Sequence, residues 1–216
     1  MNPVQITGAP EDLSIIDLLA KGGPIMIPIA LLSVLTIYFL VERWLYINSV
    51  SKRSPELIDS VADYLEKGNV NGAMASVQRE NSATGKMIFP ALSFVGKSYR
   101  EMEAVMEANA EIQIGRMEKN LGYLGVIAGI APMLGFIGTI SGIIKIFYNI
   151  SASNDISIGI IAGGLYEKMI TSGAGLFVGA IAFTCYHILN LRIQRITLNL
   201  QEDASNFLTR INGQLK

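Results

Sequence analysis

The sequence predicts an all-α integral membrane protein with three transmembrane helices. Half of its 216 residues are hydrophobic and only 16% are charged, whereas an ordinary soluble domain has about 25% charged residues. The apolar residues gather in three blocks, which are 24–41, 121–144 and 156–191. Because about 20 apolar residues in helical form cross a bilayer core of about 30 Å, each block is long enough to span a membrane.

Residues 1–21 precede the first block and are expected in the periplasm. They contain Glu11, Asp12 and Asp17 against Lys21. This composition lacks the basic region with which a secretory signal begins, so we expect the segment to be retained.

The first transmembrane helix is expected at residues 22–47. It opens with Gly22-Gly23-Pro24 and ends near Trp44 and Tyr46. These two aromatic side chains suit the belt at the water boundary, and we expect Arg43 to extend into the cytoplasmic headgroups.

Residues 48–119 are expected to form a cytoplasmic helical region. Ser54-Pro55-Glu56 supplies an N-cap, a proline at the first helical position and an early acidic residue, so a helix starts there. A second short helix is expected at 70–79. From Lys86 onward the apolar residues keep helical spacing. We therefore expect one long helix that continues from there into the second span.

The distribution of basic residues predicts the orientation. Lys and Arg are frequent between the first two blocks and absent from residues 149–157, so the positive-inside rule places the long segment and the C-terminus in the cytoplasm. The remaining elements are then transmembrane helix 2 (120–148), a short periplasmic loop (149–157), transmembrane helix 3 (158–190) and a cytoplasmic C-terminal helix (191–216). Spans 2 and 3 are thus expected to extend into the cytoplasmic region.

An acidic row in the cytoplasmic region raises the question of metal binding. It consists of Glu101, Glu103, Glu107 and Glu111, with no His or Cys among them. Hard cations need oxygen ligands that converge from several directions. We therefore interpret the row as a solvated or subunit-facing surface and expect no metal or other cofactor.

Small residues recur four apart in the second and third spans. Such strips let helix backbones approach closely, which is how helices associate in lipid. The residues expected to serve helix packing are Gly125, Gly129, Pro132, Gly135, Gly138, Gly142, Gly175 and Gly179.

Glu167 is the strongest candidate for a functional residue, since it lies in the middle of the third span. An ionisable side chain at that depth costs roughly 2.5–3.5 kcal/mol even on lenient scales, so it usually faces a bundle interior or a wet cavity. Thr171 falls one turn later on the same face, Lys168 and Ser172 lie on an adjoining face, and Thr139 lies in the second span.

Two interpretations of this cluster remain open from the residues alone. In the first, Glu167 pairs with a lysine such as Lys168 of a neighbouring helix, and the hydroxyl groups bond to backbone carbonyls. In the second, Glu167 accepts and releases a proton while the hydroxyl groups hold water or relay the proton. Three spans are too few for a carrier built from paired repeats, so an oligomer or a partner must complete any path.

The chain resembles the ExbB/TolQ/MotA proton-channel proteins, and most closely the ExbB and TolQ branch. The first matching stretch runs from Gly22-Gly23-Pro24 through Pro28 and Leu31-Leu32-Ser33 to Glu42-Arg43. The second runs from Ile130-Ala131-Pro132 through Gly135 and Gly138-Thr139 to Gly142. The third runs from Gly164-Leu165-Tyr166-Glu167 through Thr171-Ser172 to Gly175-Leu176.

This resemblance implies an ion-conducting stator of the bacterial inner membrane. It implies a homopentamer around a dimer of single-span ExbD- or TolR-like proteins, in which proton flow drives motion that a periplasm-spanning protein such as TonB receives. By position, Glu167, Thr139 and Ser172 take the places of the family's glutamate, threonine and pore-lining hydroxyl residue. Ser172 stands where threonine is common, and Lys168 stands where many relatives carry a small residue. Lys168 could be a charge partner of Glu167 or could face a lipid headgroup.

The expected function is therefore a proton-driven motor for TonB-dependent transport. The alternatives are a TolQ-like role in envelope integrity, a motility stator, and a non-conducting scaffold. Proton and sodium both remain open as the ion. The sequence has no phosphate-binding Gly-Lys-Ser/Thr loop and no paired metal ligands, so we expect neither an enzyme nor a nucleic-acid-binding protein.

Overall fold

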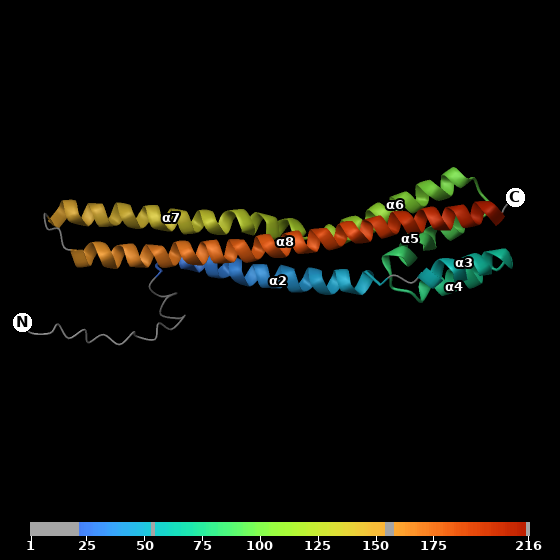
Figure 1. The fold of residues 1–216 in the computed structure, drawn as a ribbon, viewed down its shortest axis with the longest axis horizontal. Helices are drawn as coiled ribbons and strands as arrows, with labels where there is room; N and C mark the ends of the chain where they lie inside the picture. Colours follow the sequence, from blue (N-terminus) through green and yellow to red (C-terminus); the bar gives the residue numbers. More distant parts are fainter. Residues whose placement is uncertain (1–21, 53–54, 154–157, 215–216) are drawn as a thin grey trace, which may run out of the picture. The chain divides into compact units, whose positions relative to one another are not determined.

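The computed structural model describes residues 22–52, 55–153 and 158–214, and it confirms the predicted all-helical class (Figure 1). In these ranges three helical stretches are long and apolar enough to cross a membrane, namely Met26–Val50, Tyr99–Ala152 and Ile161–Ile211. As predicted, the helices of the second and third spans extend well beyond the apolar blocks. The expected N-terminal segment 1–21 and residues 154–157 of the expected loop lie outside the described residues.

The chain divides into two units, each described by itself. The three-helix unit comprises the described residues of 1–37 and 125–183. It contains the first half of α2 (Met26–Val50), most of α7 (Leu121–Ser153) and the first half of α8 (Ile158–Gln214). The bundle unit comprises the described residues of 38–124 and 184–216. It contains the remainder of these helices and α3 (Pro55–Glu66), α4 (Val70–Gln78), α5 (Ala83–Ala91), a 3₁₀ turn (Leu92–Phe94) and α6 (Tyr99–Glu118).

The short helices of the bundle unit begin where polar side chains satisfy the free amide groups of the first turn. The side-chain Oδ1 of Asn69 accepts from the Gly72 amide at 2.8 Å, and the Ser82 hydroxyl accepts from the Gly85 amide at 3.0 Å. Ser98 and Glu101 form a reciprocal capping box at the start of α6. Such caps each stabilise a helix end by about 1 kcal/mol.

The prediction of one uninterrupted helix from Lys86 into the second span was wrong. The chain leaves helical geometry after Phe94, where Gly96 adopts a φ of +88° that favours glycine. The chain leaves helical geometry a second time between α6 and α7, where Asn120 has a φ of +64°. Asparagine tolerates this left-handed conformation better than most residues. The apolar spacing continues across both breaks, and spacing alone therefore did not reveal them.

The bundle unit has a compact apolar core. Large side chains from several helices are fully buried in it, among them Ile47 of α2, Met87 and Ile88 of α5, Met106 and Met117 of α6, and Leu189, Leu200 and Phe207 of α8. Asp203 is only 3% exposed beside this core, and it accepts a hydrogen bond of 2.7 Å from the Thr84 hydroxyl. The buried carboxylate is therefore hydrogen-bonded, as buried polar groups usually are.

Arg43 corrects a second expectation, because its side chain does not extend toward headgroups. The residue is only 4% exposed, it pairs with Glu42, and its Nη1 donates to the Arg116 carbonyl at 3.0 Å. That carbonyl belongs to the last turn of α6, where no intrahelical donor remains. Arg43 thus joins α2 to the end of α6. The cation beside Trp44 is Arg192, whose Cζ lies 4.4 Å from the ring centre.

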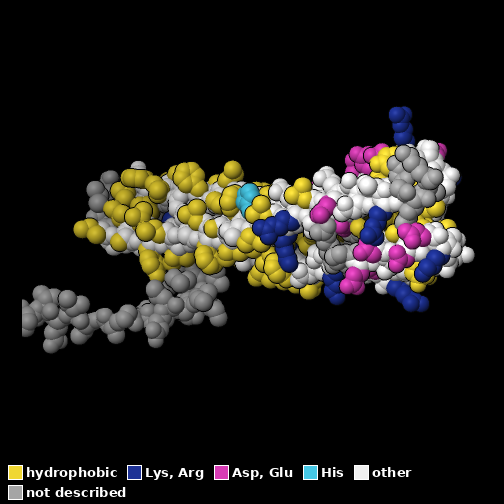
Figure 2. Space-filling model, turned by 45° about the vertical axis from the view of Figure 1, so that its right-hand side comes forward, with side chains coloured by type: hydrophobic (Ala, Val, Ile, Leu, Met, Phe, Trp, Pro, Cys, Tyr) yellow, Lys and Arg dark blue, Asp and Glu magenta, His cyan; other side chains and the backbone are white. Residues whose placement is uncertain are grey.

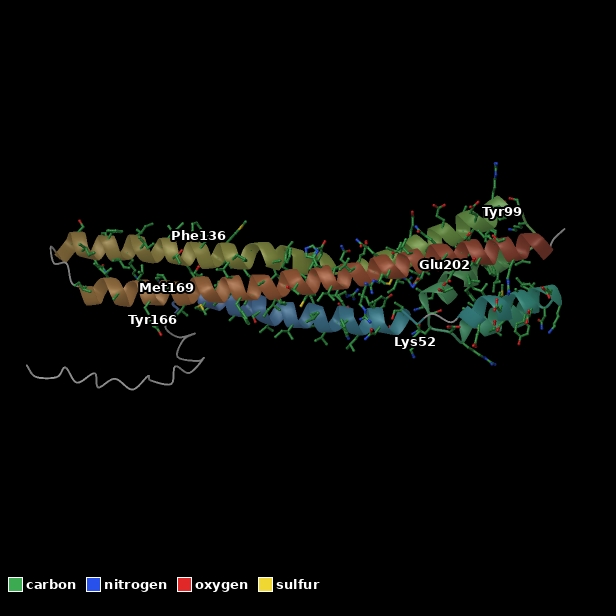
Figure 3. The ribbon with its side chains drawn as sticks, in the orientation of Figure 1. Lys52, Tyr99, Phe136, Tyr166, Met169 and Glu202 are labelled. Atoms are coloured by element: carbon green, nitrogen blue, oxygen red, sulfur yellow. The ribbon has the colours of Figure 1, made fainter. Side chains whose placement is uncertain are left out.

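On the face that Figure 2 shows, many apolar side chains are exposed on the three-helix unit, whereas charged side chains gather on the bundle unit. Phe136 of α7 is 64% exposed and Met169 of α8 is 68% exposed. Both are labelled in Figure 3 with Tyr166, which is also exposed. Large apolar side chains exposed in such numbers mark contact with lipid or with other protein chains.

Candidate functional site

The candidate residues lie at the contact between α7 and α8. We call this contact the seam and define it by three positions at which a glycine of α7 packs closely on a residue of α8. Gly135 faces the backbone of Ser172, and a Cβ placed on this glycine would lie 3.1 Å from the Ser172 Cα and carbonyl oxygen. A Cβ on Gly138 would lie 2.7 Å from the Thr171 Cγ2. A Cβ on Gly142 would overlap the side chain of Lys168. The seam thus exists because glycine leaves room for the residue opposite.

Thr171 is the most deeply buried of the candidates, with 1% of its surface exposed. Its hydroxyl donates to the Gly22 carbonyl at 2.7 Å. The bond joins α8 to the turn that precedes α2, across 149 positions of the sequence. Thr171 therefore holds together two of the three helices of this unit.

Thr139 and Ser172 are half-buried. The Thr139 hydroxyl donates to the Phe136 carbonyl of its own helix at 2.6 Å. It directly follows Gly138, so it lies beside the second position of the seam. Ser172 contributes its backbone to the first position. The structure thus brings Thr171, Ser172 and Lys168 into one seam and places Thr139 next to it.

Glu167 lies in α8 by its backbone, and its side chain lies outside the part of the chain that the structure describes. In sequence it directly precedes Lys168 and stands one helical turn before Thr171. Its assignment as the ion-binding carboxylate stays a prediction.

Lys168 is half-buried, and its Cγ, Cδ and Cε atoms cross α7 at Gly142. Nζ is one bond beyond Cε, so the ammonium group lies close to the same crossing. An alanine in place of Gly142 would overlap this stem. The sequence singled out both residues, but it gave no sign that they meet.

The glycines expected to serve packing differ in their surroundings. A Cβ on Gly175 would lie 2.5 Å from the Ala131 carbonyl oxygen, and one on Gly179 would lie 2.5 Å from the Pro132 Cγ. These contacts extend the seam beyond its three positions. By contrast, a Cβ on Gly129 would meet nothing within 4 Å, and this glycine is exposed. Gly129 therefore packs on none of the residues that the structure describes.

The acidic row of α6 lies at a groove in the bundle unit. Glu103, Glu107 and Glu111 line this groove of about 440 Å³ between α6 and α8, and Met106 and Leu200 line it beside them. Their arrangement along one helix resembles a polar rim of an apolar surface more than a converging set of ligands.

Two residues with a clear structural role were not recognised as such from the sequence. Gly22 supplies the carbonyl that Thr171 binds, and Arg116 supplies the one that Arg43 binds. Both acceptors are backbone atoms far away in sequence, and no local pattern points to them.

Comparison with known proteins agrees with this architecture. A profile for the MotA/TolQ/ExbB proton channel family matches residues 75–202. That stretch contains every residue of the seam. It also contains α6 and the end of α4.

Individual relatives give the same picture. The chain is 25% identical to the biopolymer transport protein ExbB-like 1 of Synechocystis, over 100% of this chain and 82% of the relative. It is 27% identical to the biopolymer transport protein ExbB of Neisseria meningitidis, over 90% of this chain and 95% of the relative. It is also 29% identical to the Tol-Pal system protein TolQ of Haemophilus influenzae, over 44% of this chain and 40% of the relative.

Proposed function

Because the chain belongs to the MotA/TolQ/ExbB proton channel family, we propose that it is the proton-conducting stator subunit of a TonB-type energy-transducing complex. It would convert proton-motive force into mechanical work on a periplasm-spanning partner and so energise outer-membrane transport. The observation that carries the proposal is the α7–α8 seam, where Thr171, Ser172 and Lys168 lie together inside an apolar unit.

The seam suggests how proton binding becomes motion. A carboxylate in an apolar unit must face water or a polar partner while it is charged, whereas the protonated group is neutral and tolerates apolar neighbours. When Glu167 takes up a proton, its side chain becomes neutral and can move from polar to apolar surroundings. Proton binding can therefore drive a movement of α8. The hydroxyl groups of Thr139, Thr171 and Ser172 have acceptor oxygens with which they hold or relay the proton. A second acid, on another chain, would complete the path.

The assembly that we propose is a homopentamer around a dimer of ExbD- or TolR-like single-span helices. The exposed apolar side chains of α2, α7 and α8 support this, since some of them must meet lipid and others can meet neighbouring chains. Gly129 and Gly173 also support it, because each presents an open glycine face at which another helix can approach. A TonB-like protein would receive the motion.

The experiment that tests the proposal is Glu167→Gln in the complex reconstituted in liposomes. We expect proton uptake to fall to the level of empty liposomes while the complex assembles normally, because the amide cannot take up a proton at neutral pH. Glu202→Gln is the matched control, since Glu202 is an exposed carboxylate of the same helix in the bundle unit (Figure 3). Parent-like uptake by Glu167→Gln would refute the proton path.

A TolQ-like role is the second candidate, and the match to the Haemophilus TolQ favours keeping it. Deletion of the gene separates the two functions. Loss of siderophore or vitamin uptake indicates the TonB-type role, whereas detergent sensitivity and cell chaining indicate the TolQ-type role. A non-conducting scaffold would give assembled complex without proton flux in the parent protein.

A further inference from the structure

Arg192 of α8 lies where the apolar run of the third span gives way to polar residues. Its Cζ lies 4.4 Å from the centre of the Trp44 ring of α2, and the residue is half-buried. Its Nη1 is buried and has no hydrogen-bond partner among the residues that the structure describes. Buried donors are normally hydrogen-bonded. The stacked guanidinium therefore has a capacity for hydrogen bonding that the described residues do not use.

The charges around Arg192 favour an anionic ligand. Residues 184–201 of α8 contain Arg192, Arg195 and His187 but no Asp or Glu. Arg195 is exposed and follows Arg192 by three residues, so the two side chains leave neighbouring positions of the helix surface. On α2, Glu42 is paired with Arg43. Within these described stretches, no carboxylate is left to neutralise Arg192.

Exposed apolar side chains adjoin this cation on both helices. Val41 precedes Trp44 by three residues and is 50% exposed, and Ile188 precedes Arg192 by four residues and is 48% exposed. At these spacings each apolar residue shares a helix face with the residue that follows it. Both lie one turn closer to the middle of the apolar run of their helix. A ligand that covers both ends therefore needs an anionic head and an apolar tail.

A phospholipid has this combination, and its phosphate suits a stacked arginine. Arginine binds phosphate through two parallel N–H bonds, and stacking on an aromatic ring leaves the donors in the plane of the guanidinium. Tryptophan is typical of the membrane–water boundary, where headgroups lie. Phosphatidylglycerol has a net negative charge, whereas the choline of phosphatidylcholine neutralises its phosphate. Two arginines without a neighbouring acid therefore favour the anionic lipid.

We propose that Trp44, Arg192 and Arg195 form a binding site for the phosphate headgroup of an anionic phospholipid, whose acyl chains lie along Val41 and Ile188. The bound lipid supplies hydrogen-bond acceptors to the Arg192 guanidinium. It contacts α2 and α8 together, so it stabilises their contact at this point. The inference goes beyond the proposed function, and it does not depend on the proton path.

Trp44 is the only tryptophan of the chain, so its fluorescence reports on this site. The test uses the full chain in vesicles of phosphatidylcholine that contain a small fraction of a lipid with brominated acyl chains, because bromine quenches a tryptophan that it contacts. One basic residue strengthens binding to an anionic lipid about fivefold. From quenching at equal lipid content, we expect at least an about fivefold preference for brominated phosphatidylglycerol over brominated phosphatidylcholine.

Arg192→Gln removes the stacked charge and should lower this preference about fivefold. Lys119→Gln is the matched control, because it removes one charge from an exposed lysine two residues before α7, and it should keep the preference of the parent. Equal quenching by both lipids in the parent would overturn the proposal, and so would an equal loss in the two variants. Where Arg192→Gln fails to reconstitute, Arg195→Gln replaces it, and an unchanged preference in that variant would overturn the site.

Inorganic phosphate distinguishes a lipid headgroup from a soluble ligand with the same chemistry. It is added at millimolar concentration on both sides of vesicles that contain brominated phosphatidylglycerol, and sodium chloride of equal ionic strength is the control. We expect Trp44 to stay quenched, because the acyl chains add to the hold of the lipid on the site. Recovery of fluorescence with phosphate but not with chloride would assign the site to a soluble phosphate and overturn the assignment to a lipid.

Discussion

At the scale of single residues, Thr171 makes two contacts, one through its hydroxyl group and one through its methyl group. The hydroxyl donates to the Gly22 carbonyl, and the methyl carbon packs on Gly138. Valine has nearly the same shape without the donor. Replacing Thr171 by valine therefore leaves the packing and removes the hydrogen bond, so the Gly22 carbonyl loses this partner.

We expect Thr171→Val to lower the free energy of unfolding by about 1–3 kcal/mol, the cost of an unsatisfied buried polar group. Thermal unfolding of the purified complex in detergent measures the change. Thr209→Val is the control, because the Thr209 hydroxyl donates to the Ser205 carbonyl on an exposed face of the same helix. Equal destabilisation by both substitutions would contradict a special role for the Thr171 bond.

Residue chemistry was predictable where it depended on local spacing and not where it depended on distant contacts. Thr171 was recognised as a candidate because it lies one helical turn after Glu167. The carbonyl that accepts its hydrogen bond belongs to Gly22, 149 positions away, and could not be predicted. Arg43 was expected near headgroups because it ends an apolar run, yet it binds the Arg116 carbonyl 73 positions away. The energetic gain of satisfying a helix end outweighed the preference of arginine for the water boundary.

At the scale of helices, the glycine strips show what periodicity can and cannot predict. Spacing by four predicted that α7 and α8 approach closely, and a Cβ on Gly138, Gly142, Gly175 or Gly179 would meet atoms of the opposite helix. The same spacing also includes Gly129, where an added Cβ would meet nothing within 4 Å among the described residues. A strip marks one face of a helix, but the register of two helices decides which part of the face they share.

Gly175→Ala tests the seam. Its added Cβ would lie 2.5 Å from the Ala131 carbonyl oxygen and 3.0 Å from the Gly135 Cα, and both are backbone atoms that cannot rotate away. We expect a loss of about 1–3 kcal/mol in stability, as overpacking usually costs. Unfolding in detergent measures this loss.

Gly173→Ala controls for the intrinsic effect of alanine on the same helix. A Cβ at Gly173 would meet nothing within 4 Å in the part of the chain that the structure describes, and alanine favours a helix over glycine by about 1 kcal/mol. We therefore expect no loss of stability in the separated subunit. A seam that tolerates Gly175→Ala as well as Gly173→Ala would not be closely packed.

At the scale of the whole molecule, the three apolar stretches were readable from composition because the bilayer demands long uncharged runs. Their orientation stays a prediction from a different principle, the retention of Lys and Arg on the cytoplasmic side. Three spans place the two ends of the chain on opposite sides of the membrane. We infer that the bundle unit is cytoplasmic and that the far end of α7 is periplasmic.

Labelling of single cysteines tests this orientation in intact cells. Lys67→Cys and Ser151→Cys, each combined with Cys185→Ala, place one thiol in the bundle unit and one near the end of α7, and both positions are exposed. A maleimide that cannot cross the inner membrane should label residue 151 and spare residue 67, since only the periplasmic thiol is within its reach. Permeabilised cells should show labelling at both positions, which confirms that each thiol reacts. Labelling of residue 67 alone in intact cells would reverse the topology, and with it the direction in which the proposed path carries protons.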